Sequence, residues 1–212
     1  MPLDAMQDPK QYITKEQALA AIEKTTNRRD EILVSLLWYT GARVSELLQL
    51  PLSRIDFEQS CVTIKSLKQR SHSKEGTPIP DHYRSVPVPD HIMKKIFSFI
   101  QDGGTRESEY LFTYDGKQPL SRQAAWTIVR DACIAAGVTR FGDKKISKRG
   151  FGPHPHVFRH GFAMNWLKKG GRPEQLQTIL GHRDYDTTRS YQRFTPKDLR
   201  DEYSKVFGEK KD

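Results

Sequence analysis

The sequence is poor in cysteine and has no long apolar run. Its 212 residues include only two cysteines, Cys61 and Cys133, which lack the spacing of a zinc site or a redox dithiol. We therefore expect two buried thiols in a reducing compartment. A membrane-spanning helix needs about 20 mainly apolar residues, and no stretch of the chain approaches that. The N-terminal residues are too polar for a signal peptide, so we expect a cytoplasmic protein that does not bind membranes.

The sequence also has no internal repeat and no linker that would divide it. A chain of this length can bury roughly 70% of its unfolded surface, which is enough for a stable domain without disulfides or a metal. We expect a loose leader over residues 1–13, one domain over residues 14–195 and a C-terminal helical tail over residues 196–212.

Positive charge is in excess. The 35 lysines and arginines outnumber the 26 aspartates and glutamates, which gives a formal net charge of +9. This balance favours a polyanionic partner, because phosphate neutralisation and counterion release dominate the affinity of proteins for nucleic acids. A basic surface by itself also fits a protein that binds no nucleic acid, so the charge alone leaves both interpretations open.

Local patterns predict a mainly helical fold with a small antiparallel hairpin (α+β). Residues 61–67 and 84–88 have the alternation of strands, and the prolines of the second place it at an edge. Segment 69–83 is expected to be a long basic loop of the kind that is functional or mobile. Segment 139–155 is expected to be a basic, glycine-rich loop that either lies over a phosphate backbone or is simply solvated. Caps, apolar periodicity and Gly or Pro stops predict helices over about 14–24, 27–41, 43–50, 90–103, 120–137, 156–168, 173–181 and 195–207.

Groups suited to phosphodiester chemistry are concentrated toward the C-terminus. His156 and Arg159 are three residues apart, so a helix presents both on one face. His182 is followed nine residues later by Tyr191. Forked guanidiniums can neutralise the oxygens of a phosphate without a metal. A phenol has a pKa of about 10, so forming phenolate at neutral pH costs about 4 kcal/mol, which nearby cations and a proton-accepting histidine offset.

The motifs that contain these residues resemble those of the tyrosine recombinase (phage integrase-type) family. The similarity extends over about residues 14–195 and keeps both the order and the spacing of the motifs. It implies the catalytic-domain fold of that family and site-specific cleavage and rejoining of DNA without metal, ATP or another cofactor. The matching motifs are Thr40-Gly-Ala-Arg43-Val-Ser-Glu46-Leu, His156-Val-Phe-Arg159-His160, Leu180-Gly-His182 and Tyr191.

The resemblance also implies a role for each residue. Arg43 and Arg159 would hold the non-bridging oxygens of the scissile phosphate, and Tyr191 would attack phosphorus to form a 3′-phosphotyrosyl link. His182 would hydrogen-bond the phosphate, and His156 would assist proton transfer at the nucleophile. Lys68 would protonate the leaving 5′-oxygen. Glu46 and His160 would orient these groups.

The implied partner is double-stranded DNA, on which the protein would form a tetramer at paired sites. In the absence of DNA the protein would be a monomer. Most members of the family carry a separate N-terminal DNA-binding domain, whereas this sequence begins almost directly at the catalytic domain. It would be either a fragment or one of the compact single-domain members. Without that second domain we expect DNA binding to be weaker and more sensitive to salt. The C-terminal helix is expected to dock either on its own domain or on a neighbouring subunit. Candidate DNA contacts are Arg70, Lys74, Arg84, Arg122, Lys144, Lys145, Lys148 and Arg149.

Several alternatives stay open at the level of sequence. Arg43 could simply pair with Glu46 on its own helix turn, Lys65 could replace Lys68, and His160 could be structural. A non-enzymatic DNA-binding protein or a type IB topoisomerase would share part of the pattern. A metal-dependent nuclease built on the histidines lacks acidic ligands beside them.

Overall fold

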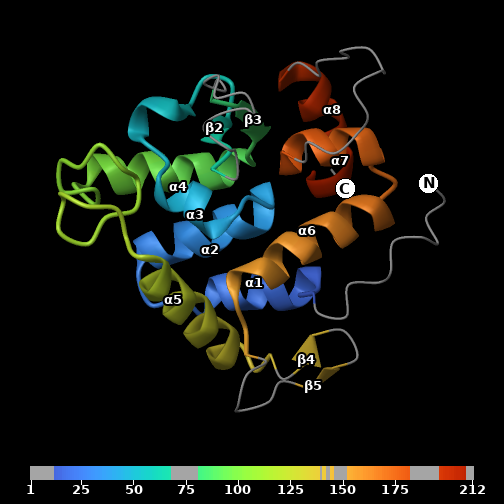
Figure 1. Ribbon diagram of the computed structural model, residues 1–212, viewed down its shortest axis with the longest axis horizontal. Helices are drawn as coiled ribbons and strands as arrows, with labels where there is room; N and C mark the ends of the chain where they lie inside the picture. The colour runs from blue at the N-terminus through green and yellow to red at the C-terminus, as the bar shows by residue number, and fades with distance from the viewer. Residues whose placement is uncertain are drawn as a thin grey trace, which may run out of the picture.

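The computed structural model describes residues 12–67, 81–138, 140–141, 144–145, 152–181 and 196–208. Figure 1 shows the arrangement of its elements. The helices are α1 (Lys15–Glu23), α2 (Arg28–Thr40), α3 (Val44–Leu48), α4 (Asp90–Gln101), α5 (Arg122–Ala135), α6 (Pro155–Lys168), α7 (Pro173–Leu180) and α8 (Pro196–Phe207), with a 3-10 turn at Leu52–Arg54. The strands are β1 (Ile55–Asp56), β2 (Cys61–Lys65), β3 (Tyr83–Pro87), β4 (Arg140–Phe141) and β5 (Lys144–Lys145).

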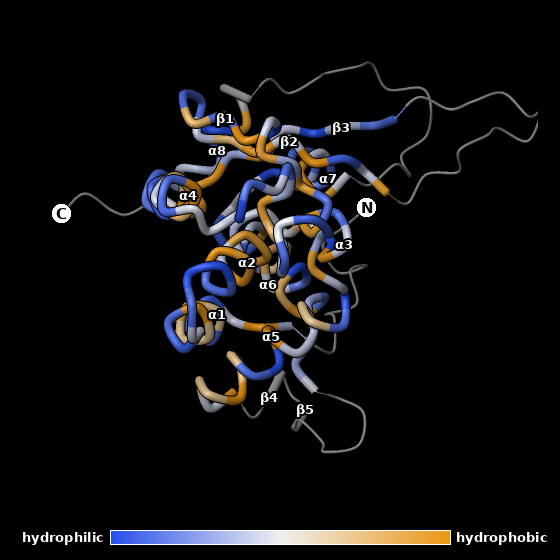
Figure 2. Tube along the Cα trace, turned by 90° about the vertical axis from the view of Figure 1, so that its left-hand side faces the viewer, coloured by the Kyte–Doolittle hydropathy of each residue, from blue (hydrophilic) through white to orange (hydrophobic). Residues whose placement is uncertain are grey.

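Helices make up most of the described chain, which confirms the predicted fold class. Figure 2 shows α2 and α6 in the middle of the molecule, with the sheet at one end and α1 and α5 at the other. Helix α2 is the centre of the core because it packs against α1, α4, α5 and α6. Among the described ranges, no helix is both long and apolar enough to cross a membrane.

Capping residues begin the helices where the sequence predicts. The Thr14 hydroxyl accepts a hydrogen bond from the Gln17 backbone N–H at 3.3 Å, and the Gln17 side chain accepts one from the Thr14 N–H at 3.0 Å. Asn27 and Ser121 cap α2 and α5 through their side chains. Each of these contacts satisfies backbone donors that the first turn leaves unpaired.

The three-stranded sheet is antiparallel in the order β1-β2-β3. Val62 pairs with Val86 and Ile64 pairs with Arg84 across β2 and β3. Strand β3 lies at the edge and ends at Pro87, which confirms the position predicted from its prolines. The sequence did not predict β1, which has only two residues.

Two further details differ from the sequence-based expectations. Residues 139–155 were expected to be a loop, but Arg140 pairs with Lys145 and Phe141 with Lys144 in a short antiparallel ladder. Ile13 was assigned to a loose leader, but it is fully buried and its N–H donates to the Val157 carbonyl at 3.2 Å.

Helix α8 docks on its own domain in this structure. The Tyr203 hydroxyl donates to the Tyr39 carbonyl at 2.7 Å, and the ring of Phe207 stacks on those of Tyr203 and Phe162 at centroid distances of 4.6 and 5.3 Å. Leu199 and Val206 are buried beside them, so the predicted apolar side of this helix is confirmed.

Candidate active site

Five of the eight residues expected at or beside the reaction lie in the described part of the chain: Arg43, Glu46, His156, Arg159 and His160. Lys68, His182 and Tyr191 lie outside it, as do Arg70, Lys74, Lys148 and Arg149 of the expected DNA contacts. Lys144 and Lys145 are described only by their strand backbone.

Arg43 stands directly before α3, after a turn formed by Gly41 and Ala42. Gly41 ends α2 in the left-handed conformation, with φ of 60°, which a glycine adopts without steric cost. The Glu46 carboxylate accepts hydrogen bonds from the Arg43 backbone N–H at 3.0 Å and from its Nη1 at 2.9 Å. The Arg43 side chain is 22% exposed. Arg43 therefore pairs with Glu46, as the alternative interpretation required, while part of its guanidinium remains accessible to a ligand.

Arg159 is buried in α6, with 7% of its surface exposed. Its Nη1 donates to the Gly41 carbonyl at 2.8 Å and its Nη2 donates to the Leu180 carbonyl at 2.9 Å. The guanidinium therefore joins the turn before Arg43 to the last residue of α7. Burial, followed by the positive charge of Arg43, lowers the pKa of Arg159 to about 9, although the charge of Glu46 acts in the opposite direction.

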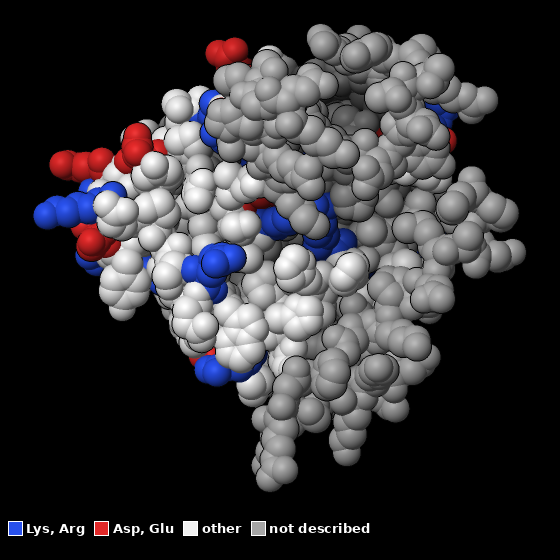
Figure 3. Space-filling model, viewed as in Figure 1, with Lys and Arg blue, Asp and Glu red and all other residues white. Residues whose placement is uncertain are grey.

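The lowered pKa of Arg159 indicates that this cation is held at an electrostatic cost. Burial is the largest part of that cost. Repulsion from Arg43 and Arg84 adds to it, and the charge of Glu46 acts against it. In Figure 3, lysine and arginine side chains gather in the middle of the face between the positions of α3 and α6. An anion bound at this place would offset the repulsion, so the site has the electrostatics of an anion-binding site.

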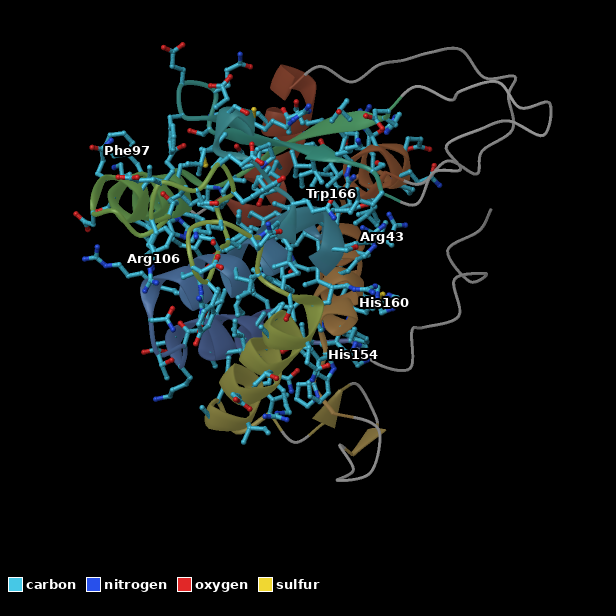
Figure 4. All side chains as sticks on the ribbon, turned by 60° about the vertical axis from the view of Figure 1, so that its left-hand side comes forward. Arg43, Phe97, Arg106, His154, His160 and Trp166 are labelled. Atoms are coloured by element: carbon cyan, nitrogen blue, oxygen red, sulfur yellow. The ribbon has the colours of Figure 1, made fainter. Side chains whose placement is uncertain are left out.

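Three histidines lie around the start of α6. Burial lowers the pKa of His156, and the positive charges of Arg159 and Arg43 lower it further. Burial is also the largest cause of the lowered pKa of His154 and of His160, with neighbouring histidines next. Because these imidazoles are neutral at pH 7, one of them can accept a proton. Figure 4 shows Arg43, His154 and His160 on the same side of the molecule.

An open cleft of about 800 Å³ adjoins the histidines. The starts of α5 and α6 form its walls, and Arg122, one of the expected DNA contacts, lies at its edge. His156, an expected catalytic residue, also lines the cleft, whereas Gln123 and Trp126 were not expected at the site. The signal that could have found them is Arg122-Gln123 at the first turn of a helix, followed by an indole at Trp126. The lining residues are Val44, Arg122, Gln123, Trp126, His154, Pro155 and His156.

Arg84 does not lie where the sequence led us to expect. It was predicted to contact DNA, but its side chain is only 2% exposed. Alternation along β3 turns Arg84 and Val86 toward the interior, whereas Tyr83 points outward. The guanidinium forms an ion pair with the Glu46 carboxylate, with Nη2 and Oε2 2.6 Å apart. Arg84 is therefore part of the interior beneath Arg43 and is not available to a DNA backbone.

Lys65 lies at the exposed end of β2 and forms an ion pair with Asp81, at 2.7 Å between Nζ and Oδ2. The choice between Lys65 and Lys68 as the acid of the reaction stays a prediction, because Lys68 lies outside the described residues. Within the described ranges, no group of three histidine, cysteine or acidic side chains is arranged to hold a metal ion.

Known proteins are similar to this chain over most of its length. Tyrosine recombinase XerA of Pyrococcus furiosus is 30% identical over 194 residues, which span 89% of this chain and 59% of that protein. The chain thus spans about three fifths of the length of this relative. A crystal structure of XerA recombinase has a TM-score of 0.64 and 28% identity, over 91% of this chain and 64% of the other.

A more distant structure has the same fold. The XerH site-specific recombinase bound to its difH substrate has a TM-score of 0.63 at 21% identity, over 92% of this chain and 50% of the other. The model of the phage integrase family matches residues 11–198, which is most of the sequence. The chain therefore belongs to the phage integrase family, the tyrosine recombinases that its motifs resemble.

Proposed function

We propose that the protein is a site-specific DNA recombinase that cleaves and rejoins strands through a covalent 3′-phosphotyrosine intermediate. The observation that carries the proposal is the placement of Arg43 and Arg159 at one turn of the chain. Arg159 holds the Gly41 carbonyl, two residues before Arg43, and Glu46 holds the Arg43 side chain. The positive charges of the two guanidiniums act on one another, and the negative charge of a ligand would balance them. A bound phosphodiester supplies that charge. Double-stranded DNA as the partner also fits the net charge of +9.

In the proposed reaction the phenol oxygen of Tyr191 attacks phosphorus and the bond from phosphorus to the 5′-oxygen breaks. The phenol proton passes to His156, whose lowered pKa keeps the imidazole neutral and able to accept it. Lys68 gives a proton to the leaving 5′-oxygen, and His182 donates a hydrogen bond to the phosphate. Attack by a 5′-hydroxyl on the phosphotyrosine reverses these steps, so rejoining needs no ATP.

Arg43 and Arg159 stabilise the charge on the non-bridging oxygens during attack. Glu46 orients Arg43 through the two hydrogen bonds that it accepts. His160 is proposed to support His156, its near neighbour on α6. Arg122 and the basic residues of segments 69–83 and 139–155 are proposed to contact the DNA backbone: Arg70, Lys74, Lys144, Lys145, Lys148 and Arg149.

The assembly proposed for the reaction is a tetramer on paired sites, formed in the cytoplasm where the DNA is. We propose that α8, which docks in cis in this structure, exchanges to a neighbouring subunit in that tetramer. A disulfide placed between α8 and its own domain would then block assembly on DNA but leave DNA binding by the monomer intact.

The test uses nicked duplexes that trap the covalent step. The protein is incubated with a pool of such duplexes, and the protein–DNA adduct is detected on a denaturing gel. The wild type should form an adduct that survives EDTA, and Tyr191→Phe should form none while still binding DNA. Tyr185→Phe is the matched control and should react normally. An adduct with Tyr191→Phe would show that another residue is the nucleophile, and loss of activity in EDTA would favour a metal-dependent nuclease.

A further inference from the structure

The buried guanidinium of Arg84 contacts three segments that are distant in the sequence. Its Nη2 donates to Glu46 Oε2 at 2.6 Å, its Nε donates to the Ile179 carbonyl at 2.7 Å and its Nη1 donates to Ser66 Oγ at 3.1 Å. All three kinds of donor nitrogen in the fork are thus engaged at once. Strand β3 supplies the arginine, whereas α3, α7 and Ser66, the residue after β2, supply the acceptors.

These contacts continue through the two proposed phosphate-binding arginines. Glu46 accepts from Arg84 with Oε2 and from Arg43 with Oε1, so one carboxylate joins the two guanidiniums. At the end of α7, Arg84 holds the Ile179 carbonyl and Arg159 holds the next one, that of Leu180.

The second hydrogen bond of Arg159 goes to the Gly41 carbonyl, two residues before Arg43. It closes a ring of hydrogen bonds, the circuit. Starting from Arg43, the circuit passes through Glu46, Arg84, the last turn of α7 and Arg159, and returns to the turn that carries Arg43. Two chains of hydrogen bonds therefore fix the Arg43 guanidinium relative to that of Arg159. One passes through Arg84 and the other through Gly41.

The electrostatics of Glu46 depend on Arg84. Burial would raise the pKa of the Glu46 carboxyl, but the charge and the hydrogen bond of Arg84, together with hydrogen bonds from Arg43, lower it overall. Without Arg84, the buried carboxylate would keep the hydrogen bonds that it accepts from Arg43. Because an uncompensated buried charge is costly, Glu46 would then draw the Arg43 guanidinium inward, away from a bound phosphate.

The fit around Arg84 is close. Gly181 follows α7 in the left-handed conformation, with φ of 67°, and a Cβ at this position would lie 3.1 Å from Arg84 Nη1 and from Ser66 Oγ. The shape of the planar fork therefore matters as well as its charge. A lysine keeps the charge but presents a single nitrogen, which cannot reach the Glu46 carboxylate and the Ile179 carbonyl in the same way.

We propose that Arg84 is a positioning residue of the strand-cleavage reaction. It sets the distance and orientation of Arg43 relative to Arg159, so that both guanidiniums grip one scissile phosphate. Arg84 itself does not touch DNA. The inference rests on the proposed function, because it assigns a task to Arg84 within that site.

The experiment compares Arg84→Lys with Arg54→Lys on a nicked duplex that the wild type cleaves. Arg54 is the matched control, because it is an arginine beside the same sheet that stacks on the ring of Tyr83, 3.8 Å from its centroid, outside the circuit. The rate of adduct formation is measured in single turnover at saturating DNA, alongside Kd for DNA and the midpoint of thermal unfolding. We expect Arg84→Lys to cleave about 10- to 100-fold more slowly with Kd changed less than threefold, and Arg54→Lys to cleave at the wild-type rate.

A double-mutant cycle separates positioning from a general loss of stability. If Arg84 acts through Arg43, the effects of Arg84→Lys and Arg43→Ala on the cleavage rate are not additive. Once Arg43→Ala has removed the Arg43 guanidinium, Arg84→Lys can no longer misplace it. Additive effects, or a wild-type cleavage rate in Arg84→Lys, would overturn the proposal. If Arg84→Lys does not fold, the variant Glu46→Gln/Arg84→Gln removes both buried charges and is measured in the same way, with slow cleavage expected and the wild-type rate as the contrary result.

Failure of the proposed function would look different. In that case the wild type itself would form no adduct on any nicked duplex, whatever residue stands at position 84. A wild type that reacts, together with an Arg84→Lys variant that reacts equally fast, would leave the recombinase function intact and remove only the positioning role.

Discussion

At the scale of single residues, Gly41 both forms the turn before Arg43 and accepts a hydrogen bond from the buried Arg159. It ends α2 in the left-handed conformation, and its carbonyl accepts the Nη1 hydrogen bond of Arg159 at 2.8 Å. A Cβ at Gly41 would lie 2.6 Å from Cδ1 of Phe162 and 2.8 Å from Cδ2 of Leu180. A side chain at this position would therefore push the turn before Arg43 away from both α6 and α7.

We predict that Gly41→Ala lowers the free energy of unfolding by more than the roughly 1 kcal/mol that a left-handed alanine costs, and also slows adduct formation. Urea unfolding and the single-turnover assay measure the two effects. Gly137→Ala is the control, because Gly137 has φ of 68° but no atom lies within 4 Å of the position that its Cβ would take. Equal loss of stability in the two variants would show that the contact with Phe162 is unimportant.

At the scale of elements, the docking of α8 rests on an aromatic cluster. The ring of Phe207 meets the rings of Trp38, Tyr39, Phe162 and Tyr203, all at centroid distances between 4.6 and 6.2 Å. These contacts join the last described helix to α2 and α6, so α8 completes the hydrophobic core of its own domain in this structure.

We expect Phe207→Ala to lower the free energy of unfolding by about 1–3 kcal/mol, since the side chain is half-buried and the full cost of a buried phenylalanine is about 3–5 kcal/mol. Amide hydrogen exchange should at the same time become faster in α8 than in α2. Ser204→Ala, at an exposed position of the same helix, should leave both measurements unchanged. Unchanged exchange in Phe207→Ala would mean that the ring does not hold the helix in place.

At the scale of the whole molecule, folding is linked to pH through the histidines of α6. The pKa values of His154, His156 and His160 are lowered in the folded state, with burial as the largest cause for each. In the unfolded chain the same groups titrate near 6.5. Below that pH the unfolded state binds protons that the folded state does not, so the folded state loses stability.

The free energy of unfolding should therefore be constant above about pH 7.5 and fall as the pH is lowered through the histidine range. Urea unfolding at closely spaced pH values measures the curve, and His160→Gln should make it less steep. Glu46 contributes separately, because its pKa is lower in the folded state than in the unfolded chain. This difference stabilises the folded state above about pH 4.5, and the stabilisation is lost as the pH falls through the pKa of Glu46 in the folded state. A flat curve between pH 8 and 5 would contradict the lowered histidine values.

DNA binding is also a property of the whole charged surface, and its salt dependence reports the number of phosphate contacts. We predict that log Kd rises linearly with log salt concentration and that Arg122→Gln reduces the slope by about 1. Arg106→Gln is the control, because Figure 4 shows Arg106 on the side of the molecule away from Arg43. The same slope in Arg122→Gln and the wild type would remove Arg122 from the DNA contacts.

The helices and the main hairpin could be predicted because their signals are local. Helix caps and strand-ending prolines act on backbone groups close to them in the sequence, so the sequence alone reveals them. The capping side chains here are Thr14, Asn27 and Ser121. The two-residue strands β1, β4 and β5 escaped prediction because such short ladders depend on partners and not on periodicity.

The sequence by itself determined the chemistry available to this protein: its basic charge, and the order and spacing of the arginine, histidine and tyrosine motifs that place it in its family. The tertiary structure decided which cations face a ligand and which lie in the interior. Arg43 and Arg84 look alike in the sequence, but they occupy opposite sides of the Glu46 carboxylate, one 22% exposed and the other 2%. That difference arises because β3 packs against α7 and places Arg84 against Glu46 of α3. Contacts between such distant segments leave no local pattern in a sequence.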